Sequence, residues 1–200
     1  MNCIPRVLEY ASQEKYIIKI GGLVRELPII QVSNNVWIAS NADLILGDIE
    51  FIQTVAGLLS DRIKTFNPEI IVTPEAKAIA FAYEVAKKVG HKKMVIARKS
   101  VKAYMTDYLL EECSSITTRG SQVLIFVKED VEKIKNKRIC ILDDVVSTGG
   151  TITALERLVK KSGGEVVCKA AIWIEGPWYT GELVYLDELP VFMKKQSNQL

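Results

Sequence analysis

The chain has 200 residues, of which 48% are hydrophobic and 25% are charged, and its formal net charge is +2. This composition excludes wholesale disorder and favours a single α/β domain, while the nearly neutral charge argues against a nucleic-acid partner. The four cysteines are scattered and there is one histidine, so neither a zinc site nor a disulfide framework is indicated. With no signal peptide and no 18-residue apolar run, we expect a cytoplasmic protein that does not engage a membrane.

Residues 1–46 lack helical periodicity and alternate short apolar runs with turn residues. Short strands are expected at 16–20, 27–30 and 36–40. We therefore expect a small, irregular N-terminal hood beside a main sheet. Trp37 could stack on a ligand there, but packing inside the hood is the interpretation we favour.

Residues 47–176 alternate strands with amphipathic helices. The strands are expected at 69–73, 92–98, 121–127, 138–142 and 166–174, and the helices at 48–63, at 74–89 and between Thr151 and Gly163. This order predicts an α/β fold with an open, mainly parallel sheet, helices on both faces and a site where the strand-end loops meet. Residues 177–200 are expected to be a C-terminal extension of the same domain.

Two connections in this region lack a clear element of their own. Residues 99–121 are mostly polar and longer than an ordinary loop, which predicts either a lid or a disordered segment. The basic residues between 133 and 137 are expected to form a solvated turn.

The stretch 138–151 carries the strongest chemical signal. Asp143 and Asp144 follow a buried strand, and an amphipathic helix begins after a polar, glycine-containing loop of Ser147, Thr148, Gly149, Gly150 and Thr151. Free N–H groups at such a helix start bind phosphate, whereas the carboxylates suit hydroxyl groups or a divalent cation. Together they predict a ribose 5-phosphate site. The alternative is a buried strand that ends in a polar, capped turn without a ligand.

Two further strand-end loops carry cations. Thr73–Ala78 leads from a strand into a helix and contains Lys77, which predicts a second anion site. Arg98, Lys99 and Lys102 follow the next strand, as in a loop that closes over a diphosphate. The alternative for each loop is an ordinary solvated surface. Two anion sites beside a ribose site suggest 5-phosphoribosyl 1-diphosphate (PRPP), with displacement of pyrophosphate at C1 by a nitrogen nucleophile and Mg²⁺ bridging the substrate oxygens.

These motifs resemble those of type I phosphoribosyltransferases. Residues 141–151 resemble the family's PRPP motif, 73–77 its pyrophosphate loop, and Arg98, Lys99 and Lys102 the start of its flexible loop. The resemblance implies a parallel-sheet core, a hood, Mg²⁺ and usually a homodimer. It implies that Asp143 and Asp144 hold the ribose hydroxyls, with Mg²⁺ held mainly by the substrate and through water by these two residues. It places the catalytic work on Asp143, Asp144, Lys102 and Arg98, the 5-phosphate on residues 147–151, and the pyrophosphate beside Glu75, Ala76, Lys77, Arg98, Lys99 and Lys102. A non-proline cis peptide is expected between Ala76 and Lys77.

Within the purine branch of the family, the motifs fit two possible substrate bases, adenine and xanthine. The Arg-Lys and Asp-Asp pairs resemble adenine and xanthine enzymes, while hypoxanthine–guanine enzymes usually carry Asp at the position of Ser147. Xanthine enzymes place Lys where this chain has Gly176, and Glu175 would accept a hydrogen bond from an amino group, which favours adenine. Trp178 or Tyr179 could stack on the base, with a core or interface role as the alternative.

Other functions stay open at this point. A 6-oxopurine transferase is the main alternative. A PRPP-sensing transcription regulator would need a winged-helix domain, for which residues 1–46 are too short and too strand-like. No general base is distinguished among the lid candidates Asp107, Glu111 and Glu112.

Overall fold

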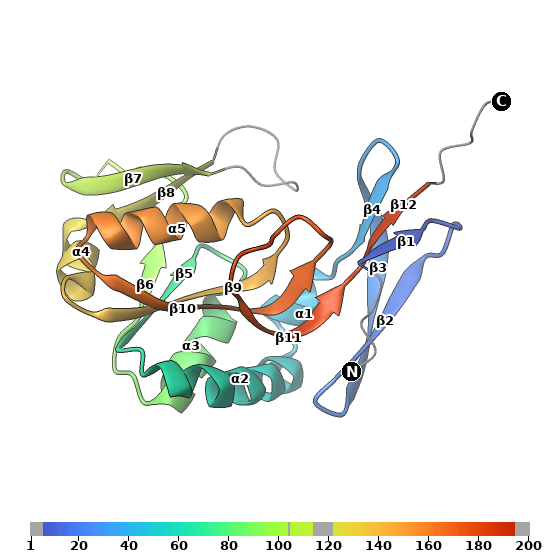
Figure 1. Ribbon diagram of the computed structural model, residues 1–200, viewed down its shortest axis with the longest axis horizontal. Coiled ribbons are helices and arrows are strands. Elements are labelled where there is room, and N and C mark those ends of the chain that lie inside the picture. The colour runs from blue at the N-terminus through green and yellow to red at the C-terminus, as the bar shows by residue number, and fades with distance from the viewer. Residues whose placement is uncertain (1–5, 104, 114–121, 195–200) are drawn as a thin grey trace.

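The computed structural model describes residues 6–103, 105–113 and 122–194, and its centre is a five-stranded parallel sheet (Figure 1). The strand order is β11-β10-β9-β5-β6, and every neighbouring pair runs parallel. The strands are β5 Ile70–Pro74, β6 Val95–Ala97, β9 Arg138–Val146, β10 Glu165–Glu175 and β11 Val184–Leu189. Apolar side chains on both faces of β9 and β10 are buried, which is why these strands are nearly continuous hydrophobic runs.

Helices cover both faces of this sheet, as the sequence predicts. In Figure 1, α2 (Ile49–Ile63) and α3 (Ile79–Val89) lie on one face and α5 (Gly150–Lys161) lies on the other. Phe51 and Phe81 anchor the first hydrophobic cluster, and Leu155 and Leu158 anchor the second. Asp48 caps α2 by accepting a hydrogen bond from the Phe51 N–H. Shorter helices are α1 Ala42–Leu46, η1 Lys64–Phe66 and α4 Lys128–Ile134.

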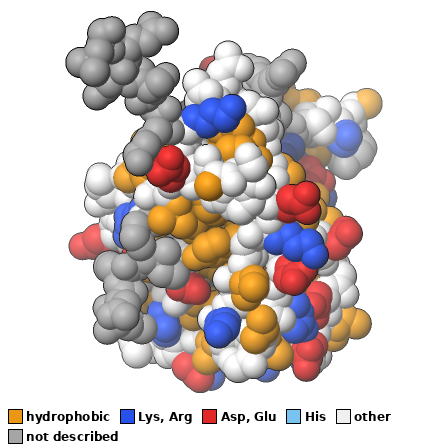
Figure 2. All heavy atoms as spheres, turned by 90° about the vertical axis from the view of Figure 1, so that its right-hand side faces the viewer, with side chains coloured by type: hydrophobic (Ala, Val, Ile, Leu, Met, Phe, Trp, Pro, Cys, Tyr) orange, Lys and Arg blue, Asp and Glu red, His pale blue; other side chains and the backbone are white. Residues whose placement is uncertain are grey.

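The hood is a second five-stranded sheet, at the right of Figure 1, with the order β1-β12-β4-β3-β2. Its strands are β1 Val7–Glu9, β2 Lys15–Ile20, β3 Leu23–Ser33, β4 Val36–Ala39 and β12 Val191–Met193. Trp37 is 7% exposed and stacks on Tyr10 with the ring centroids 3.9 Å apart, which confirms its role in packing. From the hood end, Figure 2 shows hydrophobic side chains gathered over the middle of the face, with many of the charged ones nearer its margins.

The segment after residue 176 does more than extend the core. It supplies β11 to the main sheet and β12 to the hood sheet, where β12 lies between β1 and β4. The sequence pattern misses this because strands of three to six residues carry little periodicity. Both ends of the chain therefore build the hood.

Four predicted elements differ from the structure. The second helix begins at Ile79 rather than near Pro74, because Pro74 ends β5 and residues 75–78 form a loop. The strand β9 continues to Val146, so Asp143 and Asp144 lie within it. The expected basic turn at 133–137 is partly helical, because α4 includes Lys133 and ends at Ile134.

The fourth difference from the prediction lies in the long polar connection, residues 99–121. Residues 108–113 form the strand β7 (Tyr108–Cys113), which pairs antiparallel with β8 (Gln122–Val127), so a wholly disordered connection is wrong. Arg157 of α5 donates to Glu111 at 2.7 Å and ties this hairpin to the helix. Tyr104 and residues 114–121 of the expected lid lie outside the described residues. Within the described ranges, no helix is long and apolar enough to span a membrane.

Candidate active site

The phosphate-type loop forms as the sequence predicts, at the carboxyl end of β9. Gly149 is the N-cap of α5 and has φ +81°, a left-handed conformation that favours glycine. A Cβ at Gly149 would lie 2.2 Å from Cδ2 of Tyr179, so the tyrosine ring packs directly on this turn. Tyr179 therefore braces the loop and does not line the cavity.

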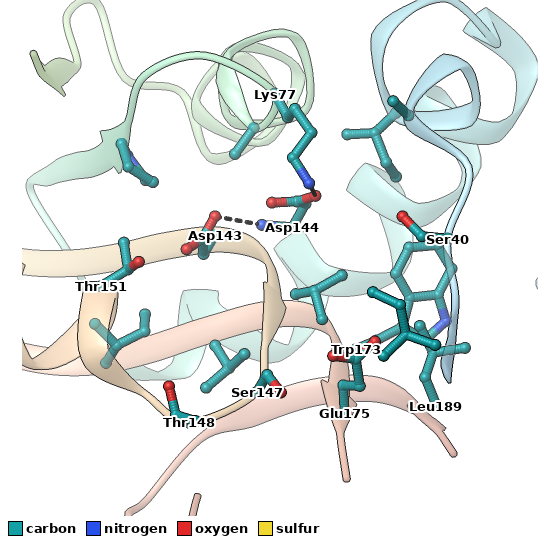
Figure 3. Close-up of a pocket in the computed structure, with 18 of the residues that line it drawn as sticks. Ser40, Lys77, Asp143, Asp144, Ser147, Thr148, Thr151, Trp173, Glu175 and Leu189 are labelled. Carbon is teal, nitrogen blue, oxygen red and sulfur yellow. Dashed lines mark hydrogen bonds and ion pairs between the residues drawn. The ribbon is translucent and has the colours of Figure 1, made fainter. Parts of the chain in front are cut away.

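A cavity of about 210 Å³ opens beside this loop (Figure 3). Its walls come from the loop after β9, the loop after β5, Lys99 after β6, Gln122 of β8, the hood with α1, and the ends of β10 and β11. The predicted residues that line it are Glu75, Lys77, Lys99, Asp143, Asp144, Ser147, Thr148, Gly149, Gly150, Thr151 and Glu175. The convergence of strand-end loops is thus confirmed.

The two aspartates and Lys77 form the charged centre of the cavity. The Lys77 ammonium lies 3.2 Å from Asp144 Oδ2, and the Asp144 N–H donates to Asp143 Oδ1 at 2.9 Å (Figure 3). Burial, and then the neighbouring charge of Asp144, hold the pKa of Asp143 well above its usual range. Burial lowers the pKa of Lys77, but Asp144, Asp143 and Glu175 more than offset it, so the pKa is raised and the ammonium stays charged.

The loop after β5 places a second set of polar groups at the cavity. Glu75 accepts a hydrogen bond from the Lys99 N–H at 3.0 Å and faces the Arg98 guanidinium at 3.7 Å. The non-proline cis peptide joins Glu75 to Ala76, so its expected position between Ala76 and Lys77 is wrong by one residue. Ala76 lies in this loop between two lining residues, although it does not line the cavity itself.

Two of the predicted cations stand apart from the cavity wall. Arg98 is held at Glu75, next to the lining, whereas Lys102 is exposed and its N–H donates to Met105 Sδ at 3.4 Å. The lid candidate Glu111 is also outside the lining, because it pairs with Arg157 and Lys161 of α5.

The remaining wall combines apolar side chains with the polar residues Ser40, Asn41 and Gln122 and with one carboxyl group, that of Glu175. Leu27 and Ile38 of the hood line the cavity. Trp173 and Leu189 also line it, and Glu175 lies near both of them (Figure 3). Glu175 is 5% exposed, and burial raises its pKa to about 7, although the Ser147 hydroxyl and Lys77 act in the opposite direction. A buried carboxyl in an apolar compartment can recognise a nitrogen base through its N–H groups.

The structure places a different tryptophan at this compartment from the one that the sequence suggested. Trp178 is 42% exposed, does not line the cavity, and packs against the turn at Gly176. Trp173 lines the cavity instead and stacks on Phe51 of α2 with the ring centroids 5.6 Å apart. The available signal was strand alternation, because Trp173 and Glu175 are two residues apart on β10 and share a face.

Comparisons with protein families, with curated proteins and with solved structures all find phosphoribosyltransferases. The family model described as the phosphoribosyl transferase domain matches residues 44–188. An adenine phosphoribosyltransferase of Thermotoga petrophila is 36% identical over 138 residues, which is 69% of this chain and 71% of the relative. One of Clostridium botulinum is 32% identical over 130 residues, covering 63% and 70% of the two chains. The crystal structure of adenine phosphoribosyltransferase from Thermoanaerobacter pseudethanolicus shares the fold, with a TM-score of 0.67 at 22% identity over 81% of this chain and 95% of that one.

Proposed function

This chain belongs to the phosphoribosyl transferase family, and we propose that it transfers the 5-phosphoribosyl group of PRPP to adenine, giving AMP and pyrophosphate in cytoplasmic purine salvage. Residues 147–151 bind the 5-phosphate, Asp143 and Asp144 hold the ribose hydroxyls, and Glu75, Lys77 and Lys99 lie where the pyrophosphate departs. The apolar compartment between the hood and β10 receives the base. Arg98 and Lys102 contribute when the loop that carries them closes over the substrate.

The choice of adenine rests on one observation, the carboxyl of Glu175 at the apolar end of the cavity. A carboxylate accepts hydrogen bonds from an amino group but repels the oxygen of a 6-oxopurine. The position after Glu175 is Gly176, which has no side chain to offer a compensating cation. The names of the curated relatives, adenine phosphoribosyltransferases, support the same choice.

Mg²⁺ fits the donor groups that the cavity provides. The carboxylates of Asp143 and Asp144 are oxygen ligands of the kind Mg²⁺ prefers. In the described part of the chain, no third His, Cys, Asp or Glu joins them in a metal-binding group. The ion would therefore take most of its ligands from PRPP and water, and it would neutralise the charge of the leaving diphosphate.

The catalytic work of the protein is then mainly positioning. The phosphate loop and the aspartates fix the sugar phosphate, and Lys77 places a positive charge beside the ribose site. Once the loop that carries Arg98 and Lys102 has closed over the substrate, the cavity keeps water from C1. No nucleophile from the protein is required, because the base supplies it.

We further propose that the chain forms a homodimer. Large apolar side chains are exposed on three helices that pack together: Leu46 of α1, Ile49 of α2 and Tyr83 of α3. Burying such side chains favours association. Light scattering coupled to size exclusion should give a mass of about twice 22.4 kDa.

A base-specificity assay tests the function. Purified protein is incubated with PRPP, Mg²⁺ and one base at a time: adenine, hypoxanthine, guanine, xanthine or orotate. We expect AMP and pyrophosphate from adenine, loss of turnover when the ion is chelated, and recovery when Mg²⁺ is restored. Turnover of a 6-oxopurine alone would reject adenine and keep the transferase assignment. A regulator would instead bind PRPP without turnover of any base.

A further inference from the structure

We propose that Tyr179 is a positioning residue for the 5-phosphate, because its ring holds the turn at Gly149 in the conformation that directs the N–H groups at the start of α5 toward the ligand. This inference rests on the proposed function, since it concerns the phosphate that residues 147–151 would bind. It gives a role in substrate binding to an aromatic residue that contacts the phosphate loop without lining the cavity.

The contact between Tyr179 and the turn is close. A Cβ at Gly149 would lie 2.2 Å from Cδ2, 2.6 Å from Cε2 and 3.3 Å from Cγ of the tyrosine, so one edge of the ring covers the place that a side chain would take. Gly149 has φ +81°, and a glycine can leave this conformation at little cost because it has no Cβ. A ring packed against the turn restricts that freedom.

A second glycine leaves room for the other end of the same ring. A Cβ at Gly181 would lie 2.6 Å from the Tyr179 hydroxyl oxygen and 2.7 Å from Cζ. The ring is therefore in contact with two backbone segments, the turn before α5 and the loop that joins β10 to β11. A side chain at either glycine would displace the ring, so both positions preserve its place on the turn.

The tyrosine is itself held by the elements that frame the phosphate loop. Its ring packs against the second hydrophobic cluster, to which Ile152 of α5 belongs. Burial lowers the pKa of Lys169 on β10, but Glu156 and the nearby Tyr179 hydroxyl more than offset it, so this pKa is raised. Lys169 in turn lies 3.2 Å from Glu156 of α5. The position of the ring is thus fixed relative to both β10 and α5.

A fixed turn matters because the loop binds phosphate through its backbone. The N–H groups must converge on the phosphate oxygens, and their directions depend on the dihedral angles of the turn. A loop that fluctuates in the free protein has to be ordered when the ligand binds, which weakens affinity. The ring of Tyr179 orders the turn beforehand. The groups proposed for the pyrophosphate, Glu75, Lys77 and Lys99, follow β5 and β6, so their affinity should not depend on this ring.

Tyr179→Ala tests the proposal through the equilibrium binding of two probes, measured by calorimetry. Ribose 5-phosphate reports on the phosphate loop, and magnesium pyrophosphate reports on the loops after β5 and β6. We expect the Kd of ribose 5-phosphate to rise about tenfold, the cost of ordering the backbone of about one residue, while the Kd of pyrophosphate stays within about twofold. KM for PRPP should rise by a similar factor, and kcat at saturating PRPP should change less than about twofold.

Two variants control the experiment. Tyr179→Phe keeps the ring and should bind ribose 5-phosphate within about twofold of wild type, because the edge over Gly149 is unchanged. Trp178→Ala is the matched control, since this neighbouring aromatic residue is exposed, packs on Gly176 and should leave both probes unchanged. Melting temperatures check that each variant is folded. If Tyr179→Ala is not folded, Tyr179→Leu, which stays apolar but lacks the ring, takes its place.

The outcomes separate positioning of the phosphate loop from general packing. An unchanged Kd of ribose 5-phosphate in the folded variant without the ring would overturn the proposal. An equal loss of affinity for both probes would also overturn it, because that is the result expected when the whole cavity is disturbed. Failure of the wild-type protein to use adenine would instead reject the proposed function, and the comparison of the two probes would still decide the role of Tyr179.

Discussion

The two ends of the cavity are built in opposite ways. The phosphate end comes from one continuous stretch, in which β9 delivers Asp143 and Asp144 and the next few residues turn into α5. The base end is assembled from β3 and β4 of the hood with the ends of β10 and β11, segments separated by more than a hundred residues. One end is thus a local property of the sequence, and the other exists only after the chain has folded.

Because they are built differently, the two ends of the cavity recognise their ligands in different ways. In the proposed function, backbone N–H groups at the start of α5 bind the 5-phosphate without using side-chain identity, so such a loop would serve any PRPP-dependent reaction. The base end depends on individual side chains, above all Glu175 and Trp173, and can change without altering the phosphate end. Substitutions at the two ends should therefore affect different kinetic constants.

The largest expected effect is at the phosphate end. Asp144→Asn removes the charge that pairs with Lys77 at 3.2 Å and that would hold the ribose hydroxyls. We expect kcat/KM to fall by about 100-fold or more, as expected when a positioned charge at the reacting centre is lost. Steady-state kinetics with adenine and PRPP measure the change. Asp61→Asn, on the exposed side of α2, is the control and should be neutral. Near wild-type kcat/KM in Asp144→Asn would disprove the ribose role of Asp144.

The next effect concerns stability and belongs to the base end. Glu175 has an ordinary pKa of 4.5 and a folded-state pKa of about 7, so the folded protein retains a proton that the unfolded chain releases. Because the unfolded state then binds fewer protons, stability falls as pH rises from 4.5 to 7, by about 3 kcal/mol at most. Glu175→Gln removes this loss.

Urea unfolding at pH 5 and pH 8 measures this loss of stability. Wild type should lose more stability between the two pH values than Glu175→Gln, and the contribution of Asp143 cancels because both proteins retain it. Equal losses in the two proteins would mean that Glu175 is ionised in the folded state with an ordinary pKa.

The contrast between the ends also explains what the sequence could predict. The parallel sheet, the helices on both faces and the set Asp143, Asp144 and Ser147–Thr151 follow from local patterns of 5 to 15 residues. The position of Trp178 outside the cavity lining could not be predicted, because its contact with Gly176 depends on a turn whose direction no periodicity encodes. The strands β11 and β12 were missed for the related reason that their partners lie far away in the sequence.

A smaller effect is expected from Gly149→Ala at the phosphate end. The residue has φ +81°, and an added Cβ would meet the Tyr179 ring at 2.2 Å. Alanine must therefore displace the ring or the turn, which should raise KM for PRPP about tenfold and lower stability by about 1–2 kcal/mol. KM for adenine at saturating PRPP should change little. Gly57→Ala is the control: Gly57 lies in α2 with open space around it, and this change should stabilise the protein by about 0.5–1 kcal/mol.

The smallest expected effect distinguishes the two tryptophans of the base end. Trp178→Ala removes a ring that is 42% exposed and packs on Gly176 outside the cavity, so KM for adenine should change less than about twofold. Trp173→Leu alters the cavity wall and its stacking on Phe51, and it should raise KM for adenine several-fold while KM for PRPP stays nearly constant. Steady-state titration of each substrate separates these constants. If Trp178→Ala weakened adenine binding as strongly as Trp173→Leu, the ring of Trp178 would have to move over the base when substrate binds, and the base end would be shaped by its ligand rather than by the folded chain alone.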